Sequence, residues 1–345
     1  MSTAANQDEQ PAGPAPATID VDPAIQQEEE SDADTQSINT TSTASLSESV
    51  LEYRRIHGRT YTQKTDYYGP NDEKQNEGLD LFHYWVTVLL DDKLCLAPVG
   101  EKAERVLDVG TGTGLWACDF ADEFPATEVI GVDISPIQPS WAPPNCKFQI
   151  DDIDQPWTWP DNHFDYIHAR NLEGCISDWA LFDREAFNAL KPGGFFEVAH
   201  LEFHAKSQNQ TLPEDHVFNR WATYIFDAFN KLGKTAEQHR NDGIVKNMEQ
   251  AGFVDIQTSK WKIPIGAWPR DPKWKEIGDS YLTGVDQSLE GYATFLLKEM
   301  MGWEYAEILV FVSEMRKELR NDKIQPIIQF QISYGRKPED APVAE

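Results

Sequence analysis

The chain has 345 residues, of which 58 are acidic and 30 are basic, so its formal charge at pH 7 is −28. At about 150 residues per domain, this length suggests roughly two domains. The first 50 residues hold ten acidic side chains and no Lys or Arg, which leaves 48 acidic against 30 basic side chains elsewhere. A phosphate backbone is repelled by such a charge, so we do not expect a nucleic-acid-binding protein.

Composition also bears on location. No window approaches the roughly 18 consecutive apolar residues of a membrane helix. The acidic, Pro- and Ala-rich N-terminus does not resemble a secretory signal. The four cysteines are widely spaced, which favours reduced thiols. We therefore expect no membrane association and a cytoplasmic location, with the nucleus as the alternative, and we expect residues 1–48 to be a disordered acidic tail.

From residue 49 onward, the sequence alternates between helical and strand patterns. An N-terminal helical cap segment is expected over 49–100, with its main helix at 79–96. Short apolar runs then predict strands at 105–109, 128–133, 146–150, 164–168, 194–202, 254–263 and 327–334. Helices are expected between them at 115–124, 181–190, 216–232, 236–251 and 273–321.

This alternation is typical of βαβ units and predicts an α/β fold. We expect a Rossmann-like, seven-stranded, mostly parallel sheet with helices on both faces. A domain of this kind would span 101–337, with a helical lid at about 273–321 inserted before the last strand and a short tail at 338–345. Apolar and aromatic residues in the lid, such as Tyr281 and Leu289, suit a bulky apolar ligand or a sealed core.

The sharpest local signal is the glycine-rich run that follows the first strand, with Gly110, Gly112 and Gly114. Glycines at this point let the backbone turn tightly and approach a ligand beside the positive end of a helix. The spacing of Gly112, Gly114 and Ala117 also fits a variant of the dinucleotide fingerprint. Asp108, just before the run, favours a ligand with a free amino group, because an anion there repels pyrophosphate.

Further carboxylates follow the next two strands. Asp133 ends the second strand, where it can accept both hydroxyls of a ribose, and Asp151 and Asp152 follow the third strand, where a carboxylate can accept from an adenine amino group. Because the carboxyl ends of parallel strands meet at one edge of the sheet, we expect these side chains to share a ligand crevice with Asp108.

Taken together, these motifs resemble the class I S-adenosylmethionine-dependent methyltransferases. The resemblance rests on DVGTGTG at 108–114, VIGVD at 129–133, DDID at 151–154, FDYIHAR at 164–170 and LKPGGFFEV at 190–198. Longer runs at 58–61, 70–85, 164–179 and 212–221 narrow it to the fungal methyltransferases typified by the velvet-complex regulator of secondary metabolism. The resemblance covers roughly residues 50–337.

The resemblance implies S-adenosylmethionine as the cofactor, with the three glycines around its methionine part. It also implies that Asp108 holds the amino group, Asp133 the ribose, and Asp152 or Asp151 the adenine. Arg170 would line the methionine carboxylate or the substrate mouth, although a structural ion pair is the alternative. Tyr61 and Tyr68 lie in a segment that such enzymes fold over the cofactor, but ordinary packing explains them equally well.

A general base is needed only when the methyl acceptor must lose a proton. His200, Glu202 and His204 alternate along the fifth strand and therefore share one face. His200 is a candidate base with Glu202 as its orienting partner or as the base itself, and His168 is a further candidate. The same three side chains resemble a metal site, but we expect no metal there.

Two functions follow from this reading. In the first, the protein is an enzyme that methylates oxygen or nitrogen of a small molecule in fungal secondary metabolite biosynthesis. In the second, it is a regulatory methyltransferase-like subunit of a nuclear velvet-type complex, with a velvet-type protein as its partner. The absence of a Lys/Arg-rich cluster favours the first.

Overall fold

The computed structural model describes residues 53–63, 66–100, 103–238 and 240–340. The tail expected at 1–48 lies outside these ranges, as does most of the short C-terminal segment. Within these ranges, no helix has both the length and the apolarity needed to cross a membrane.

Five parallel strands form one half of the central sheet. In spatial order they are β5 (Cys146–Ile150), β4 (Glu128–Asp133), β3 (Arg105–Val109), β6 (Phe164–Arg170) and β7 (Leu190–Leu201). The other half is antiparallel: β10 (Pro326–Arg336) pairs with β7, and β9 (Val254–Pro264) pairs with β10. The chain winds outward from β3 to β5 and then returns to β6. The strand order therefore reverses between β3 and β6, which is where open α/β sheets bind ligands.

All seven predicted strands are present, so the α/β sheet is confirmed. The predicted count is one short, because β8 (Lys206–Ser207) pairs with the start of β10. A strand of two residues is too short to show the alternation on which sequence prediction relies. A separate hairpin, β1 (Arg54–Ile56) with β2 (Arg59–Tyr61), was also not predicted.

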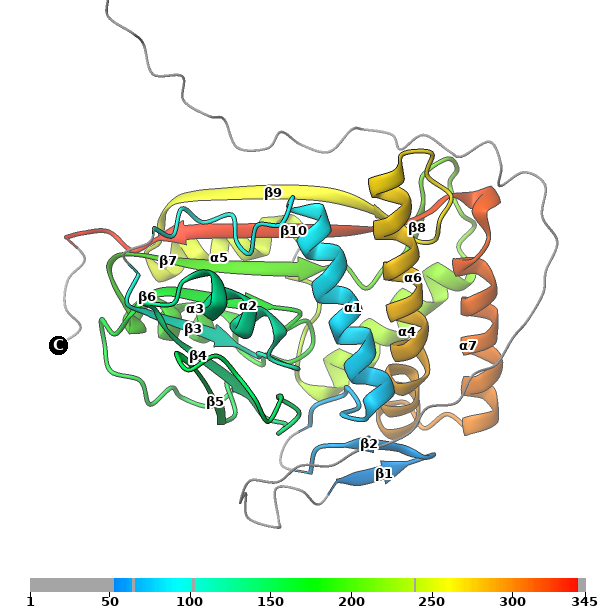
Figure 1. Ribbon diagram of the computed structural model, residues 1–345. Coiled ribbons are helices and arrows are strands. Elements are labelled where there is room, and N and C mark those ends of the chain that lie inside the picture. The colour runs from blue at the N-terminus through cyan, green and yellow to red at the C-terminus, as the bar shows by residue number, and fades with distance from the viewer. Residues whose placement is uncertain (1–52, 64–65, 101–102, 239, 341–345) are drawn as a thin grey trace, which may run out of the picture.

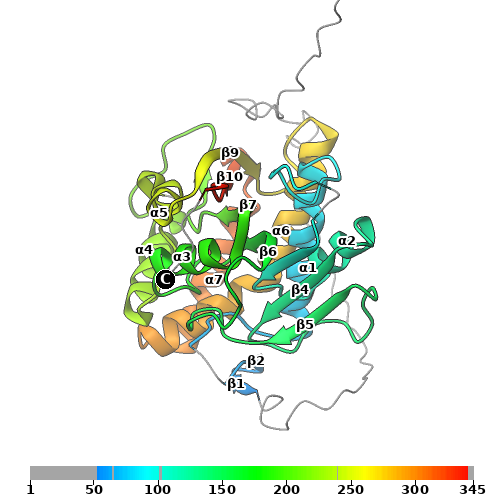
Figure 2. The same ribbon diagram turned by 90° about the vertical axis from the view of Figure 1, so that its left-hand side faces the viewer.

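Helices cover both faces of the parallel strands (Figure 2). On one face, Val106 and Tyr166 pack with α2 (Leu115–Glu123). On the other face, their neighbours Leu107 and Ile167 pack with α3 (Trp179–Ala189) and α5 (Gly243–Ala251). Adjacent residues of one strand point to opposite faces of the sheet. Both faces are covered by helices, which explains why these strands are apolar at nearly every position.

A third core lies at the carboxyl ends of the parallel strands. The arrowhead of β7 in Figure 1 points toward a group of helices there. The group comprises α1 (Glu73–Leu89), α4 (Val217–Leu232), α6 (Pro272–Ala293) and α7 (Tyr305–Leu319). Helices α1 and α6 approach closely at Gly78, where an added Cβ would lie 3.0 Å from the Gly284 carbonyl oxygen. The N-terminal segment and the late helical insertion therefore share one core.

Three predicted helices have different limits. Helix α1 begins at Glu73 rather than 79, because the Asp72 carboxylate caps it by accepting the Gln75 N–H at 3.1 Å. Helix α5 begins only at Gly243, because Asn241 and Asp242 adopt left-handed backbone conformations. The helical stretch expected at 273–321 is interrupted after α6 by a π-helix (Thr294–Met300) and by Gly302, whose φ is +74°.

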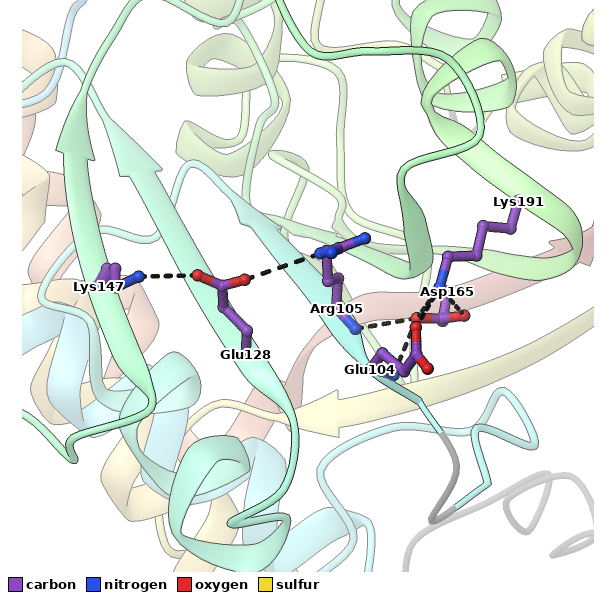
Figure 3. Close-up of polar contacts among 6 residues, drawn as sticks. All are labelled: Glu104, Arg105, Glu128, Lys147, Asp165 and Lys191. Atoms are coloured by element: carbon purple, nitrogen blue, oxygen red, sulfur yellow. Dashed lines mark hydrogen bonds and ion pairs between the residues drawn. The ribbon is translucent and has the colours of Figure 1, made fainter.

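The amino-end edge of the sheet is held by polar contacts (Figure 3). Asp165 Oδ2 accepts the backbone N–H of Arg105 at 2.9 Å, and the ammonium group of Lys191 lies 2.9 Å from Asp165 Oδ1. Glu128 bridges Lys147 and Arg105 across three strands. Each exposed ion pair of this kind contributes little to the free energy of folding. They align β3, β4, β5 and β6 at the edge opposite to the ligand cavities.

Candidate functional site

Two neighbouring cavities lie between the sheet and the helices at the carboxyl ends of the strands. The first is lined by the ends of β3, β4 and β6, and the second mainly by α1, α6 and the residues after β7. Four residues line both cavities: Tyr67, Leu79, Phe82 and Asn171. The two cavities therefore adjoin at these four side chains.

The glycine run forms the floor of the first cavity. Gly110, Gly112 and Gly114 all have positive φ angles, of +72°, +58° and +80°. A side chain at Gly112 would project to within 3.6 Å of Leu79, in the cavity wall. Gly114 lies behind the turn, where it precedes α2 and faces Phe148, so it shapes the turn without lining the cavity. The run thus combines close backbone approach with a helix N-terminus, as predicted.

Asp108 is buried at the end of β3 and organises the turn. Its Oδ2 accepts the hydroxyl hydrogen of Thr111 at 2.6 Å, and its Oδ1 accepts the Nδ1–H of His168 at 2.7 Å. The imidazole of His168 also stacks on Trp116, with ring centroids 3.8 Å apart. Burial lowers the pKa of His168, so its ring is neutral at pH 7. His168 therefore positions Asp108 at the cavity wall, where both residues lie.

Arg170 ends β6 and points into the same cavity. Its guanidinium donates to His83 Nδ1 at 3.1 Å, and His83 Nε2 lies 2.8 Å from Asp119 Oδ2. Because a guanidinium can only donate, His83 accepts at Nδ1 and donates its Nε2–H to Asp119. Burial lowers the pKa of Arg170 to about 10, so it remains charged at neutral pH. The result is a fixed cation in the cavity wall.

Asp133 lies at the end of β4, next to the glycine run. Its carboxylate accepts the backbone N–H of Gly112 at 2.8 Å and that of Ser135 at 2.9 Å. Burial raises the pKa of Asp133 to about 6. Asp152 also lines the first cavity, whereas Asp151 is exposed and lines a smaller hollow beside Trp157 and Trp159. The structure therefore brings Asp152 into the cavity with Asp108 and Asp133 and leaves Asp151 outside it.

The second cavity is mainly apolar and aromatic. Its wall combines residues far apart in the sequence: Tyr67, Tyr68, Phe82, Trp85, Phe203, Trp221, Tyr281 and Tyr292. Tyr68 contacts Tyr292 edge-on, with centroids 5.0 Å apart. Tyr281 and Leu289 line this cavity, while Tyr61 lies outside it and donates its hydroxyl to the Gly291 carbonyl oxygen. Such a lining suits a bulky apolar molecule.

A buried carboxyl–imidazole pair lies at this cavity. Glu173, which lines it, is 2 % exposed, and its Oε1 lies 3.1 Å from His200 Nδ1 and accepts the Leu201 N–H. Burial raises the pKa of Glu173 to about 8. Glu202 also lines the second cavity and is bound by the ammonium group of Lys206 at 2.8 Å. The residues proposed for catalysis, His200 and Glu202, further share a small hollow beside β10, which agrees with their expected common face.

Sequence reasoning missed three residues of this region. Asn171 directly follows Arg170 and Glu173 lies three residues after it, but no spacing rule distinguishes them from ordinary loop residues. His83 lies on the predicted helix at 79–96, and only its position facing Arg170 reveals its role. Asn171 Oδ1 is buried and has no hydrogen-bond partner in the described ranges, at the boundary of both cavities.

Comparison with known proteins agrees with this geometry. A family model described as a methyltransferase domain matches residues 53–258. The chain is 36% identical to methyltransferase pytC of Aspergillus terreus, over 90% of this chain and 96% of that protein. It is 33% identical to the secondary metabolism regulator LAE1 of Cochliobolus heterostrophus, over 79% and 90% of the two chains.

Among solved structures, the chain is similar to phosphoethanolamine N-methyltransferase 2 of Haemonchus contortus in complex with S-adenosyl-L-methionine. The identity is 18% and the TM-score is 0.44, with 79% of this chain and 54% of that chain covered.

Proposed function

We propose that this chain, which belongs to the S-adenosylmethionine-dependent methyltransferases, transfers the methyl group to oxygen or nitrogen of an apolar small molecule held in the second cavity. The observation that carries this proposal is the shared wall of the two cavities. A cofactor in the first cavity and an acceptor in the second meet at Asn171 and Phe82. Its fungal relatives, a methyltransferase and a regulator of secondary metabolism, support a role in secondary metabolism.

The residues of the first cavity fit the cofactor. Arg170 and the glycine run offer a cation and backbone N–H groups to an amino-acid end. Asp133 offers a carboxylate to ribose hydroxyls, and Asp152 offers one to an adenine amino group. When bound, the cofactor supplies an electrophilic methyl group on a sulfonium. This chain positions the acceptor and excludes water from it, because the wall of the second cavity is aromatic.

The unpartnered oxygen of Asn171 supports a ligand at the boundary. A buried acceptor without a hydrogen bond costs about 1–3 kcal/mol, unless a ligand donates to it. An acceptor hydroxyl or amine, or the amino group of the cofactor, can supply that donor. In either case, the donor group of the ligand would lie next to Asn171, where the two cavities adjoin.

The test supplies purified protein with methyl-labelled S-adenosylmethionine and an extract of its source cells. Label is counted separately in the solvent-extractable and protein fractions. We expect label in the extractable fraction, and mass spectrometry of the labelled peak identifies the acceptor. Background counts in that fraction, despite measurable cofactor binding, overturn the proposal.

The relation to LAE1 favours one alternative, a regulatory subunit that works with a velvet-type protein. Label in the protein fraction supports this second function. So does recovery of a stable stoichiometric partner when the full chain is purified from its source cells.

A further inference from the structure

A carboxyl group in the wall of the second cavity is buried against an imidazole. Glu173 and His200 are each 2 % exposed, and Glu173 Oε1 lies 3.1 Å from His200 Nδ1. The backbone N–H of Leu201 also donates to Glu173 Oε1, so strand β7 fixes the carboxyl group from one side. Burying a carboxyl among aromatic side chains is costly. A carboxyl group that is retained in such a place therefore suggests a functional role.

We propose that Glu173 is the group that removes the proton from the methyl acceptor, with His200 as the residue that positions Glu173. This inference rests on the proposed function. It implies an acceptor with a proton to lose, namely a hydroxyl or amine carried on an apolar body.

The position of Glu173 suits this task. Glu173 lines the second cavity and follows β6 in the same loop as Asn171, which lines both cavities. Glu202, the other carboxylate at this cavity, is bound by Lys206 through both oxygens, at 2.8 and 2.9 Å. An ammonium partner competes with an acceptor proton for those oxygens. Glu173 has an imidazole in that place, which can share a proton with it.

Among the titratable side chains facing one another here, Glu173 is the one whose pKa lies near neutral pH. Burial raises the pKa of Glu173 to about 8. The titratable groups facing it are Cys175, Tyr67, Tyr68, Tyr281 and Tyr292. Burial raises the pKa of each of these groups as well, so they stay protonated where Glu173 ionises. A proton acceptor works best when its pKa is close to the working pH.

The Glu173 carboxylate takes the proton of the acceptor O–H or N–H bond, and the electron pair of that bond remains on the acceptor atom. An electron pair of that atom forms the new bond to the methyl carbon. The carbon–sulfur bond breaks and its electrons remain on sulfur, which becomes a neutral thioether. Deprotonated Glu173, with His200 donating to it, is the reactive form.

The test compares Glu173→Gln with Asp183→Asn in the full chain. Asp183 is a matched control, because it is also a buried carboxyl, 2 % exposed, and it lines neither cavity. We expect Glu173→Gln to slow labelling of the extractable acceptor by about 100-fold or more, with S-adenosylhomocysteine affinity unchanged. Asp183→Asn should retain the rate within about twofold, a scale set by the small effects of substitutions away from a site.

A second measurement needs no acceptor. The infrared band of a protonated carboxyl, taken as wild type minus Glu173→Gln, should disappear as the pH rises through about 8. His200→Asn should shift that transition, which a purely structural role of His200 would not do. If Glu173→Gln does not fold, Glu173→Ala with added formate replaces it, and partial recovery of the rate supports the base.

The outcomes separate the two proposals. Labelled product from the wild type, at an equal rate in Glu173→Gln, overturns the base alone. Absence of extractable label from the wild type overturns the proposed function and the base role with it. If Glu173→Gln and Asp183→Asn both lower the methylation rate, the base role of Glu173 is also overturned, because the loss is then not specific to Glu173.

Discussion

The backbone N–H of Gly112 donates to Asp133 Oδ2 at 2.8 Å, and this bond joins the turn after β3 to the end of β4. The same carboxylate also accepts the N–H of Ser135. Asp133 thus accepts hydrogen bonds that hold the turn, and its side chain also lines the first cavity. Cofactor binding should therefore depend on its charge.

The first prediction concerns pH. Burial raises the pKa of Asp133 to about 6, and the cofactor requires the ionised form, so binding should weaken as pH falls through that value. We expect the dissociation constant of S-adenosylhomocysteine to be constant from about pH 7.5 to 6.5. It should then rise toward about tenfold per pH unit, as competition by one proton requires. Isothermal titration calorimetry measures this directly.

Asp133→Asn is the control for that prediction. It should bind more weakly, by about 10- to 100-fold for a lost charge-assisted hydrogen bond. Its affinity should not vary with pH across the same window. If its pH dependence equals that of the wild type, the titrating group lies elsewhere, with His83 and His168 as the nearby imidazoles.

The second prediction concerns the amino-acid end of the cofactor. Arg170→Ala should weaken binding of S-adenosylhomocysteine by about 10- to 100-fold, because a hydrogen bond to a charged group is worth about 1.5–3 kcal/mol. Methylthioadenosine lacks the amino-acid carboxylate, so its affinity should change by less than threefold. An equal loss for both ligands would instead mean that Arg170 only supports the fold through His83.

The third prediction distinguishes two adjacent carboxylates. Asp152 lines the first cavity and Asp151 does not. Asp152→Ala should therefore weaken both S-adenosylhomocysteine and methylthioadenosine by about tenfold, as expected for one lost hydrogen bond. Asp151→Ala should leave both affinities within about twofold. The reverse order would place the adenine beside Asp151 instead.

The fourth prediction concerns the second cavity. Val285 lies on α6 and lines this cavity but not the first. Val285→Trp should fill acceptor space and reduce methylation of the extractable acceptor by more than about tenfold, since added bulk in a packed site costs about 1–3 kcal/mol. Cofactor affinity should be unchanged.

Leu309→Trp is the matched control, because Leu309 is 40 % exposed on α7 and lines neither cavity. It should leave the methylation rate unaltered. Normal methylation by Val285→Trp would show that the acceptor binds outside the second cavity.

The sheet, and most of the carboxylates at its edge, could be predicted from the sequence alone. Strands buried on both faces are continuous apolar runs, and the polar residue that ends each run must emerge at one side of the sheet. Asp108 and Asp133 could therefore be placed together from the sequence, but both Asp151 and Asp152 were expected beside them, and only Asp152 lines the first cavity. The glycine run was equally readable, because positive φ angles restrict the residue type.

Which carboxyl group contacts which imidazole, and where an acceptor fits, depends on packing between distant segments and could not be predicted from the sequence. Glu173 and His200 lie on different elements, as do Gly78 of α1 and Gly284 of α6, and each pair is joined by packing between segments distant in the chain. The second cavity lies where α1 packs against α6 near the ends of the strands. Periodicity records which face of an element is buried, but not which other element buries it, so those contacts carry no short-range pattern.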